Sequence, residues 1–342
     1  MLYCSTVALI QGGPASAIPT KYSEFIGKCL HMTMPNGKLD IMVLKTPPTL
    51  VEAERTVRCL YDIARKEAAR QGITSHKIDV TVLLDGLDIE VNRNQTWEVV
   101  AASKFELELP KLLRSLVPDN SDIQLLPVVL LGGGINTGVS LGGTPGGLTT
   151  PMNKKYQEIE EMEQKKETDA ARHGETLYSR TWEYNVIALG GTFDHLHEGH
   201  KLLLTMAGYL ARECLIVGIT GPELLKNKKY AQAMQSYMER KESVRNFLNY
   251  VYPSLDLDIV MINDIYGPTA QVKEIDGLVV SKETAAGGDS VNKLRSEKGW
   301  PELVIFEVGL ISDSDSGDDS DKVSSTQLRK EEIEQREKRE KL

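Results

Sequence analysis

From Tyr184 onward, short apolar runs alternate with longer segments of helical spacing. The strand-like runs are NVIALGG, CLIVGITG, LDIVMIND, DGLVVSKE and LVIFEV. Helices are expected after His200, in SYMERKESVRNFLNYV, TAQVKEI and DSVNKLRSEKG, and from Ser325 to the end. Because strands joined by crossover helices run parallel, this half predicts a doubly wound, five-stranded parallel sheet. In such sheets ligands bind at the carboxyl ends of the strands, where the strand order reverses.

Residues 1–131 show the same alternation in a weaker form. STVALI, KLDIMVLKT, KIDVTVLLDGL and IQLLPVVLLGGG read as strands, the segment from Val51 to Gln71 has an apolar helical face, and SKFELELPKLLRSL is partly helical. A length of 342 residues also fits two α/β domains, residues 1–131 and 184–342. The first domain holds no phosphate motif and no cluster of titratable residues. We therefore expect it to serve contact or stability.

Two segments of biased composition separate the expected elements. Residues 132–183 are glycine-rich and then charged, and their glycine spacing matches neither G-x-G-x-x-G nor a P-loop, so we interpret them as a linker. Residues 312–322 form an acidic insert that we expect to be disordered. After it, Ser324 and Gln327 form a capping box that starts a charged C-terminal helix.

Composition excludes several classes of function. The formal net charge of −9 argues against general binding to nucleic acid or to an anionic membrane. No apolar run has the length of a membrane span. The four cysteines are scattered without a C-x-x-C pair, which favours a reducing compartment, and we expect the cytoplasm, with the nucleus also allowed. Because the net charge of the chain is negative, any phosphate must be bound by a local site rather than by an overall positive charge.

The segment GGTFDHLHEGH, residues 190–200, lies where the first strand of the second domain gives way to a helix. Gly190 and Gly191 let the backbone approach a ligand closely. Thr192 adds a hydroxyl group at the strand end. His197 and His200 fall at the start of the helix, where free N–H groups and the helix dipole favour an anion. This combination suits phosphate and the charge that develops during nucleotidyl transfer.

The histidines allow two other interpretations. His195, His197 and His200 offer three nitrogen ligands, but their i, i+2, i+5 spacing across a turn is not usual for zinc, and no metal site is predicted. In the second interpretation the histidines only cap the helix and fill space.

Two separated motifs carry a resemblance to a known family. H-E-G-H resembles the H-x-G-H signature of the nucleotidyltransferase superfamily, and VSSTQLRK resembles its second signature, with Val323 in place of the usual Ile. The longer runs GGTFDHLHEGHKLLLT, GITGPELLKNKKY, ERKESVRNFL and VVSKETAAGGDSVNKLRSEKG resemble the eukaryotic phosphopantetheine adenylyltransferases. The resemblance extends from about Tyr184 to Arg329. No P-loop of the GxxxxGK[ST] type occurs, so the chain lacks the signature of a fused kinase. In this respect it resembles the monofunctional form of the family known from fungi.

The resemblance implies transfer of the adenylyl group of ATP to 4′-phosphopantetheine, giving dephospho-coenzyme A and pyrophosphate, with Mg²⁺ accompanying ATP. It implies that His200, helped by His197, stabilises the α-phosphate, and that Thr192 holds the phosphate of phosphopantetheine. A lysine of the LLKNKKY loop would bridge the two phosphates; Lys228 is preferred, with Lys226 and Lys229 as alternatives. Further implied contacts to the substrates and the nucleotide are Gly190, Gly191, Phe193, Lys282, Arg295, Ser324, Ser325, Thr326 and Arg329.

Related enzymes remain alternatives at this point. Cytidylyltransferases and nicotinamide-mononucleotide adenylyltransferases share both signatures, whereas a class I aminoacyl-tRNA synthetase would need a Lys-Met-Ser-Lys-Ser loop and a basic tRNA surface. An additional role as a scaffold for other enzymes of coenzyme A synthesis, through the N-terminal domain, also stays open.

Overall fold

The computed structural model describes residues 1–132 except 46, 48, 74–76, 85–95 and 117–120, residues 184–309 except 227 and 283, and residues 324–340. Most of the predicted linker and the whole acidic insert at 312–322 therefore lie outside the described residues. In the part of the chain that is described, no helix is both long and apolar enough to cross a membrane.

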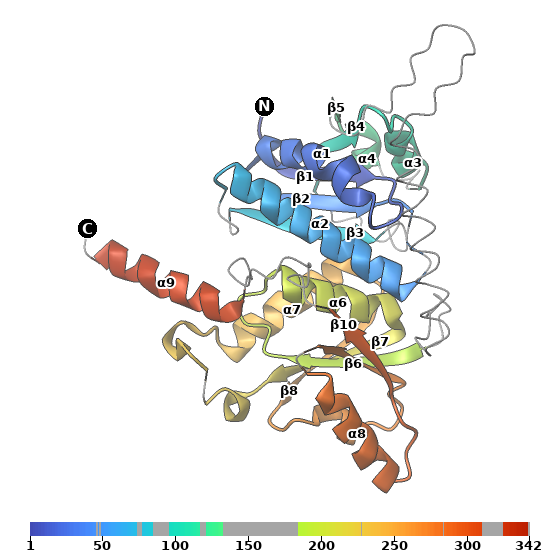
Figure 1. The fold of residues 1–342 in the computed structure, drawn as a ribbon, viewed down its shortest axis with the longest axis vertical. Coiled ribbons are helices and arrows are strands. Elements are labelled where there is room, and N and C mark those ends of the chain that lie inside the picture. The colour runs from blue at the N-terminus through green and yellow to red at the C-terminus, as the bar shows by residue number, and fades with distance from the viewer. Residues whose placement is uncertain are drawn as a thin grey trace, which may run out of the picture.

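The N-terminal unit is built around a five-stranded parallel sheet (Figure 1). Its strands have the order β3-β2-β1-β4-β5, and every pair of neighbours is parallel. The elements are β1 (Tyr3–Ile10), α1 (Ile18–Met32), β2 (Thr33–Val43), α2 (Leu50–Arg70), β3 (Ile78–Leu84), β4 (Val99–Ser103), α3 (Leu109–Leu116), α4 (Ser121–Leu125) and β5 (Val128–Leu131).

The C-terminal unit contains the second sheet, with the order β10-β9-β6-β7-β8 and all pairs parallel. The expected doubly wound sheet is confirmed. Its elements are β6 (Tyr184–Gly191), α6 (Glu198–Leu210), β7 (Ala211–Thr220), η1 (Pro222–Leu224), η2 (Ala231–Ala233), α7 (Tyr237–Val251), β8 (Asp256–Ile262), η3 (Gly267–Ala270), β9 (Gly277–Ser281), α8 (Ala286–Glu297), β10 (Val304–Val308) and α9 (Ser325–Glu340).

The expected helix in TAQVKEI is wrong, because only the four-residue 3₁₀ turn η3 forms there. The backbone carbonyls of Thr269, Val272, Lys273 and Ile275 accept hydrogen bonds from the guanidinium group of Arg295. Carbonyls that point at one side chain cannot also serve as the acceptors of a regular helix.

The two sheets share one topology. Counted in chain order within each unit, both have the strand order 3-2-1-4-5. They differ at the turn after the first strand, where the site is expected. In the C-terminal unit His197 caps helix α6, whereas in the N-terminal unit Ala17 occupies the N-cap of α1 and makes no side-chain cap. The N-terminal unit therefore repeats the fold without the histidines.

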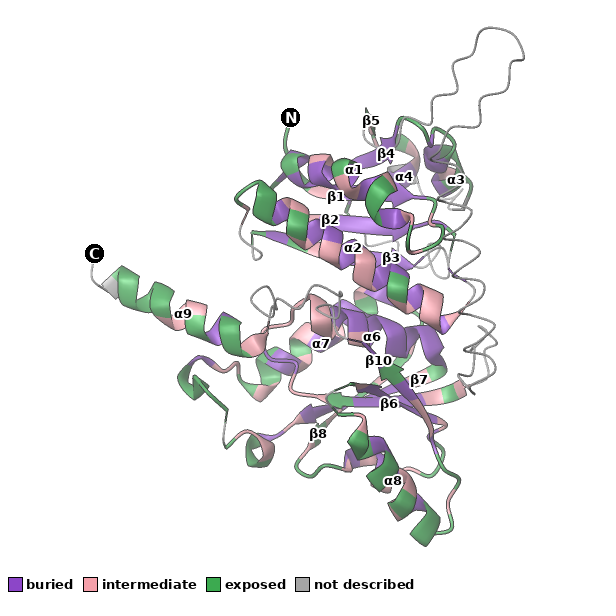
Figure 2. Cartoon of the chain, viewed as in Figure 1, coloured by how far each residue is buried: buried purple, intermediate pink, exposed green. Residues whose placement is uncertain are grey.

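Helix α6 is buried between the C-terminal sheet and helix α2 of the N-terminal unit (Figure 2). One continuous cluster of buried apolar residues includes members of both units. Polar contacts join them as well. The hydroxyl group of Tyr250 donates to the buried carboxylate of Asp40, and that of Tyr209 donates to the carbonyl of Pro47 at 3.0 Å. The two units therefore pack as one body.

Candidate active site

A cavity of about 670 Å³ lies at the carboxyl ends of the C-terminal strands. The residues that follow β6, β7, β8, β9 and β10 all contribute to its wall, as expected for a doubly wound sheet. Of the sequence-predicted site residues, it brings together Gly190, Gly191, Thr192, Phe193, His197, His200, Lys228, Ser324, Ser325, Thr326 and Arg329.

His197 is the N-cap of α6, as the sequence predicted for the start of this helix. Its Nδ1 accepts a hydrogen bond from the N–H of Gly199 at 3.2 Å, so Nδ1 carries no proton. The proton is then on Nε2, which lies 3.5 Å from Oγ of Ser325 at the start of α9. One imidazole ring thus connects the two signatures, which are 128 residues apart in the chain.

His200 lies one turn into α6, with its ring stacked on that of His197 at a centroid distance of 3.9 Å. The ring of Phe193 covers it from another direction at 5.4 Å. Burial, together with the neighbouring His197, holds the pKa of His200 well below its usual value. His200 is therefore neutral at physiological pH, and it acts as a hydrogen-bond donor or acceptor rather than as a cation.

The loop between β6 and α6 has a strained backbone. Phe193 and His195 have φ angles of +51° and +48°, a region that residues with a side chain rarely adopt. A Cβ atom on Gly191 would lie 2.9 Å from the ring of Phe193, so this glycine is needed for the packing of that ring. Buried Arg240 of α7 donates to the carbonyls of Thr192 and Thr220 and so holds two strand ends together. Strain of this kind is typical of a functional loop.

Two contacts from this loop hold helix α9. The buried carboxylate of Asp194 accepts from Nη1 of Arg329 at 2.6 Å. His195 lies with Nδ1 3.1 Å from Asp194 and Nε2 2.7 Å from Glu332 of α9. These contacts place the start of α9 beside His197. There Oγ of Ser324 accepts from the N–H of Gln327 at 3.3 Å, which is half of the predicted capping box, since the side chain of Gln327 donates to Glu331 instead.

Both acidic partners raise the pKa of His195. The contact with Asp194 is the larger cause, and the contact with Glu332 adds to it against the opposing effect of burial. Burial alone would raise the pKa of Asp194, but its interactions with His195, Arg329 and the N–H of Gln235 lower it overall. His195 thus links Asp194 to Glu332 of α9. Within the described residues, no group of three His, Cys, Asp or Glu could hold a metal.

The lysine loop presents one of its three candidates to the cavity. Lys228 lines it, whereas Lys226 pairs with Glu223 at 2.5 Å on the surface. Lys229 does not line the cavity, and its backbone carbonyl accepts from Nε of Arg329 at 2.9 Å. The geometry thus favours Lys228 among the three.

The segment that contains these residues is similar to known proteins. A family model described as cytidylyltransferase-like matches residues 188–331. A phosphopantetheine adenylyltransferase of Saccharomyces cerevisiae is 43% identical over 148 residues, which cover 43% of this chain and 48% of the yeast protein. A phosphopantetheine adenylyltransferase of Methanopyrus kandleri is 33% identical over 146 residues, which cover 43% of this chain and 89% of the archaeal protein. The chain belongs to the phosphopantetheine adenylyltransferase family.

The matches differ in how much of each relative they include. The chain spans about half the length of the yeast relative, but nearly all of the archaeal one. The segment that matches the archaeal relative is thus about the size of the C-terminal unit. A solved structure of a protein with unknown function from Archaeoglobus fulgidus is 32% identical and covers 37% of this chain and 92% of its own, with a TM-score of 0.34.

Besides Lys226 and Lys229, two more of the residues carried over from the family resemblance, Arg295 and Lys282, do not line the cavity. Arg295 is fully buried, and its guanidinium group donates to five backbone carbonyls, among them that of Pro301 at 2.8 Å. The expected contact of Arg295 with nucleotide phosphates is therefore wrong, because its donors are already used inside the protein. Lys282 does not line the cavity either, and its charge acts on Glu54 of α2.

Arg329 and Phe193 line the cavity, but their side chains mainly contact other residues of the protein, whereas both were expected to contact the nucleotide. Arg329 is 2% exposed, and its donors go to Asp194, Thr326 and the carbonyl of Lys229. It positions α9 rather than offering a free charge. Phe193 has a buried ring that supports His200.

The sequence analysis missed several residues that shape the site. Arg65 comes from the N-terminal unit, and Asp264 follows β8; both line the cavity. Arg240 holds the strand ends from inside. Asp264 could have been found from its place at a strand end, since it is the last residue of the predicted strand LDIVMIND. Nothing in the local sequence distinguishes Arg65 or Arg240 from other helical arginines.

Proposed function

We propose that this chain transfers the adenylyl group of ATP to 4′-phosphopantetheine, releasing pyrophosphate and forming dephospho-coenzyme A. The observation that carries the proposal is the meeting of His197, His200, Lys228 and the start of α9 around one cavity at the strand ends. Membership in the phosphopantetheine adenylyltransferase family supports the choice of substrates.

The reaction is an in-line displacement at the α-phosphorus of ATP. An oxygen of the phosphopantetheine phosphate forms a bond to this phosphorus, while the bond to the oxygen bridging to the β-phosphorus breaks and its electron pair leaves with pyrophosphate. The attacking phosphate is already ionised at neutral pH, so no general base is required. Catalysis then depends on positioning and on stabilising charge.

The proposed reaction assigns a role to each of four residues that line the cavity. Neutral His200 offers a hydrogen-bond donor to the α-phosphate, and the ring of His197 stacked on it fixes its orientation. Thr192 offers its hydroxyl group to the phosphate of phosphopantetheine, and Lys228 bridges the two substrates. Mg²⁺ enters with ATP, is held chiefly by the ATP phosphates and neutralises part of their charge.

Hydroxyl and N–H groups at the start of α9 suit the β- and γ-phosphates, because the N-terminus of a helix attracts anions. Ser325 is the first residue of α9, and its Oγ lies beside His197.

A cytoplasmic location and a scaffold role for the N-terminal unit stay predictions from the sequence.

The test is to incubate the pure protein with MgATP and 4′-phosphopantetheine and to follow pyrophosphate. Parallel reactions contain CTP with phosphocholine, and ATP with nicotinamide mononucleotide. We expect pyrophosphate from the first pair alone. Release of pyrophosphate from another pair, with none from the first, would assign the chain to a sibling activity.

A further inference from the structure

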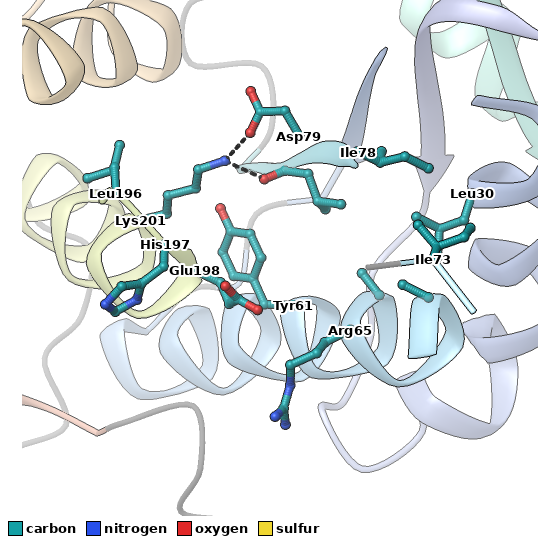
Figure 3. A pocket seen from close by; sticks show the side chains of 13 residues that line it. Leu30, Tyr61, Arg65, Ile73, Ile78, Asp79, Leu196, His197, Glu198 and Lys201 are labelled. Carbon is teal, nitrogen blue, oxygen red and sulfur yellow. Dashed lines mark hydrogen bonds and ion pairs between the residues drawn. The ribbon is translucent and has the colours of Figure 1, made fainter. Parts of the chain in front are cut away.

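The residue that follows His200 on helix α6 reaches across the boundary between the two units. Lys201 is 8% exposed, and its Nζ donates to the carboxylate of Asp79 and, at 2.7 Å, to the carbonyl of Val80 (Figure 3). Both acceptors belong to β3 of the N-terminal unit, outside the residues 188–331 that the family model matches. A buried ammonium group depends on such acceptors, so Lys201 fastens the start of α6 to the other unit.

Lys201 and His200 face different cavities. Lys201 lines a smaller cavity of about 240 Å³ between the units, whereas His200 lines the large one, to which Lys201 does not contribute. Neighbouring side chains on a helix point roughly 100° apart, because one turn contains about 3.6 residues. A contact that holds Lys201 on one side of α6 therefore fixes the rotation of the helix, and with it the direction of His200.

The same turn of α6 also carries His197. The backbone N–H of Lys201 donates to the carbonyl of His197 at 2.9 Å and so closes the first turn of the helix. The ring of His197 stacks on that of His200, and its Nε2 lies 3.5 Å from Oγ of Ser325. A displacement of this turn would therefore move both rings relative to the start of α9.

The other end of α6 makes a second contact with the N-terminal unit. The hydroxyl group of Tyr209 donates to the carbonyl of Pro47 at 3.0 Å. Tyr209 lies roughly two and a half turns after His200, near the end of the helix. This contact holds the two units together, but it does not act on the turn that carries the histidines.

We propose that Lys201 is a positioning residue, through which the N-terminal unit holds His197 and His200 in the orientation that adenylyl transfer requires. This inference rests on the proposed function, because the orientation matters for that reaction. Lys201 acts through the helix rather than on the substrates, since its side chain does not line the large cavity. A misplacement of about 1 Å can cost roughly a hundredfold in rate, even when its cause lies away from the chemistry.

The test uses the full chain and four variants. Lys201→Met removes the charge and the donors but keeps a long apolar side chain. Lys201→Arg keeps a charged donor, and the adjoining cavity leaves room for the larger guanidinium group. Asp79→Ala removes one acceptor, at a side chain that is 61% exposed. Tyr209→Phe is the matched control, because it removes a contact of the same helix with the same unit.

In Lys201→Met we expect kcat to fall about ten- to a hundredfold, with a much smaller change in KM for either substrate. Asp79→Ala should show the same pattern at a smaller size, because the carbonyl of Val80 remains. Lys201→Arg should recover most of kcat. Tyr209→Phe should lower the melting temperature and leave kcat at the wild-type value.

Asp79→Ala also separates an effect of position from an effect of charge. Loss of a carboxylate makes the surroundings more positive, so charge alone would lower the pKa of His200. A first turn that is no longer held lets water reach the stacked rings, so positioning predicts that the pKa of His200 rises toward its usual value. NMR titration of the imidazole signals measures this pKa without any substrate.

A wild-type kcat in Lys201→Met overturns the proposal, and where that variant does not fold, a wild-type kcat in Asp79→Ala does so. An equal loss of kcat in Tyr209→Phe overturns it too, and so does an unchanged or lowered pKa of His200 in Asp79→Ala. The titration distinguishes this inference from the proposed function. A wild-type chain that releases no pyrophosphate refutes the proposed reaction, whereas a raised pKa of His200 in Asp79→Ala still supports the role of Lys201 in holding the histidines.

Discussion

At the scale of single residues, packing fixes the position and the protonation state of His200, the residue to which the proposed function assigns the α-phosphate. Its ring is enclosed by His197 and Phe193, and its pKa is held low by burial and by the neighbouring imidazole. In the proposed reaction, a neutral donor whose position is fixed before the substrate arrives needs no reorganisation as charge develops on the α-phosphate. Under that proposal, the hydrogen bond from His200 stabilises the transition state more than the bound substrate.

We predict that His200→Ala lowers kcat by about 10²–10³-fold and changes KM for ATP much less. Steady-state kinetics of pyrophosphate release measure both constants. His31→Ala, an exposed histidine on α1, is the control and should leave both unchanged. A normal kcat in His200→Ala would remove the proposed role of this ring.

Arg295 shows the opposite case, a charged side chain used for stability. It is completely buried, and it ties η3 and the segment after α8 together through their carbonyls. Replacing it by Met leaves several buried carbonyls without a donor, each at a cost of ~1–3 kcal/mol.

We therefore predict that Arg295→Met lowers the free energy of unfolding by about 2–4 kcal/mol, measured by urea denaturation. At temperatures where the variant is folded, KM for ATP should stay near the wild-type value. A selective rise in KM for ATP without loss of stability would restore a nucleotide role for Arg295.

At the scale of elements, the docking of α9 depends on titratable contacts. His195 lies between Asp194 and Glu332, and its pKa is raised by both. A raised folded-state pKa means that the contribution of His195 is fully present below its unfolded pKa, near 6.5, and is lost as pH rises through the folded value. The pKa of Glu332 is lowered, chiefly by His195, so its contribution is lost only as pH falls through that lowered value.

We predict that α9 is most firmly docked in mildly acidic solution and loosens as pH rises from about 6.5 through the raised folded-state pKa of His195. Protection factors from amide hydrogen exchange, corrected for the intrinsic rate at each pH, report this directly for residues 328–334. His195→Gln should flatten the pH dependence, whereas Arg336→Gln, farther along α9, should keep it. An equal slope in His195→Gln and wild type would contradict the assignment.

At the scale of the whole molecule, the two units share a buried polar contact. Asp40 of β2 accepts from the indole N–H of Trp97 at 2.6 Å and from the hydroxyl group of Tyr250 on α7. Burial raises the pKa of Asp40. Because this carboxylate is buried, each donor that it loses is costly, and the contact from Tyr250 crosses between the units.

We predict that Tyr250→Phe lowers the free energy of unfolding by about 1.5–3 kcal/mol, the usual range for a hydrogen bond to a charged group. Urea denaturation measures the change. Tyr237→Phe is a matched control on the same helix, where the ring lies 5.8 Å from Nζ of Lys241, and it should change stability little. Equal stabilities for the two variants would show that the contact between Tyr250 and Asp40 is not stabilising.

The sequence by itself determined the sheet of the C-terminal unit and the place of its site. Alternating runs predicted five parallel strands, and a strand followed by glycines and histidines predicted the turn that borders the cavity; the anion site expected there stays a prediction. These features are local, since strand and helix periods and helix caps depend on neighbouring residues. In the N-terminal unit, α1 and β4 were not predicted, because a five-residue run such as VVAAS does not distinguish a buried strand from a helix segment.

Only the tertiary structure decided which charged side chains reach the site. Arg295, Arg329 and Arg65 all lie on helices, yet the first is buried among carbonyls, the second holds α9 through Asp194, and the third borders the cavity from the other unit. What an arginine does depends on the acceptors that surround it, and here those acceptors come from residues far away in the chain, as with the 135 positions between Asp194 and Arg329. Helical periodicity sets the face on which a side chain lies, but only the packing of one element on another brings its partners within hydrogen-bonding distance.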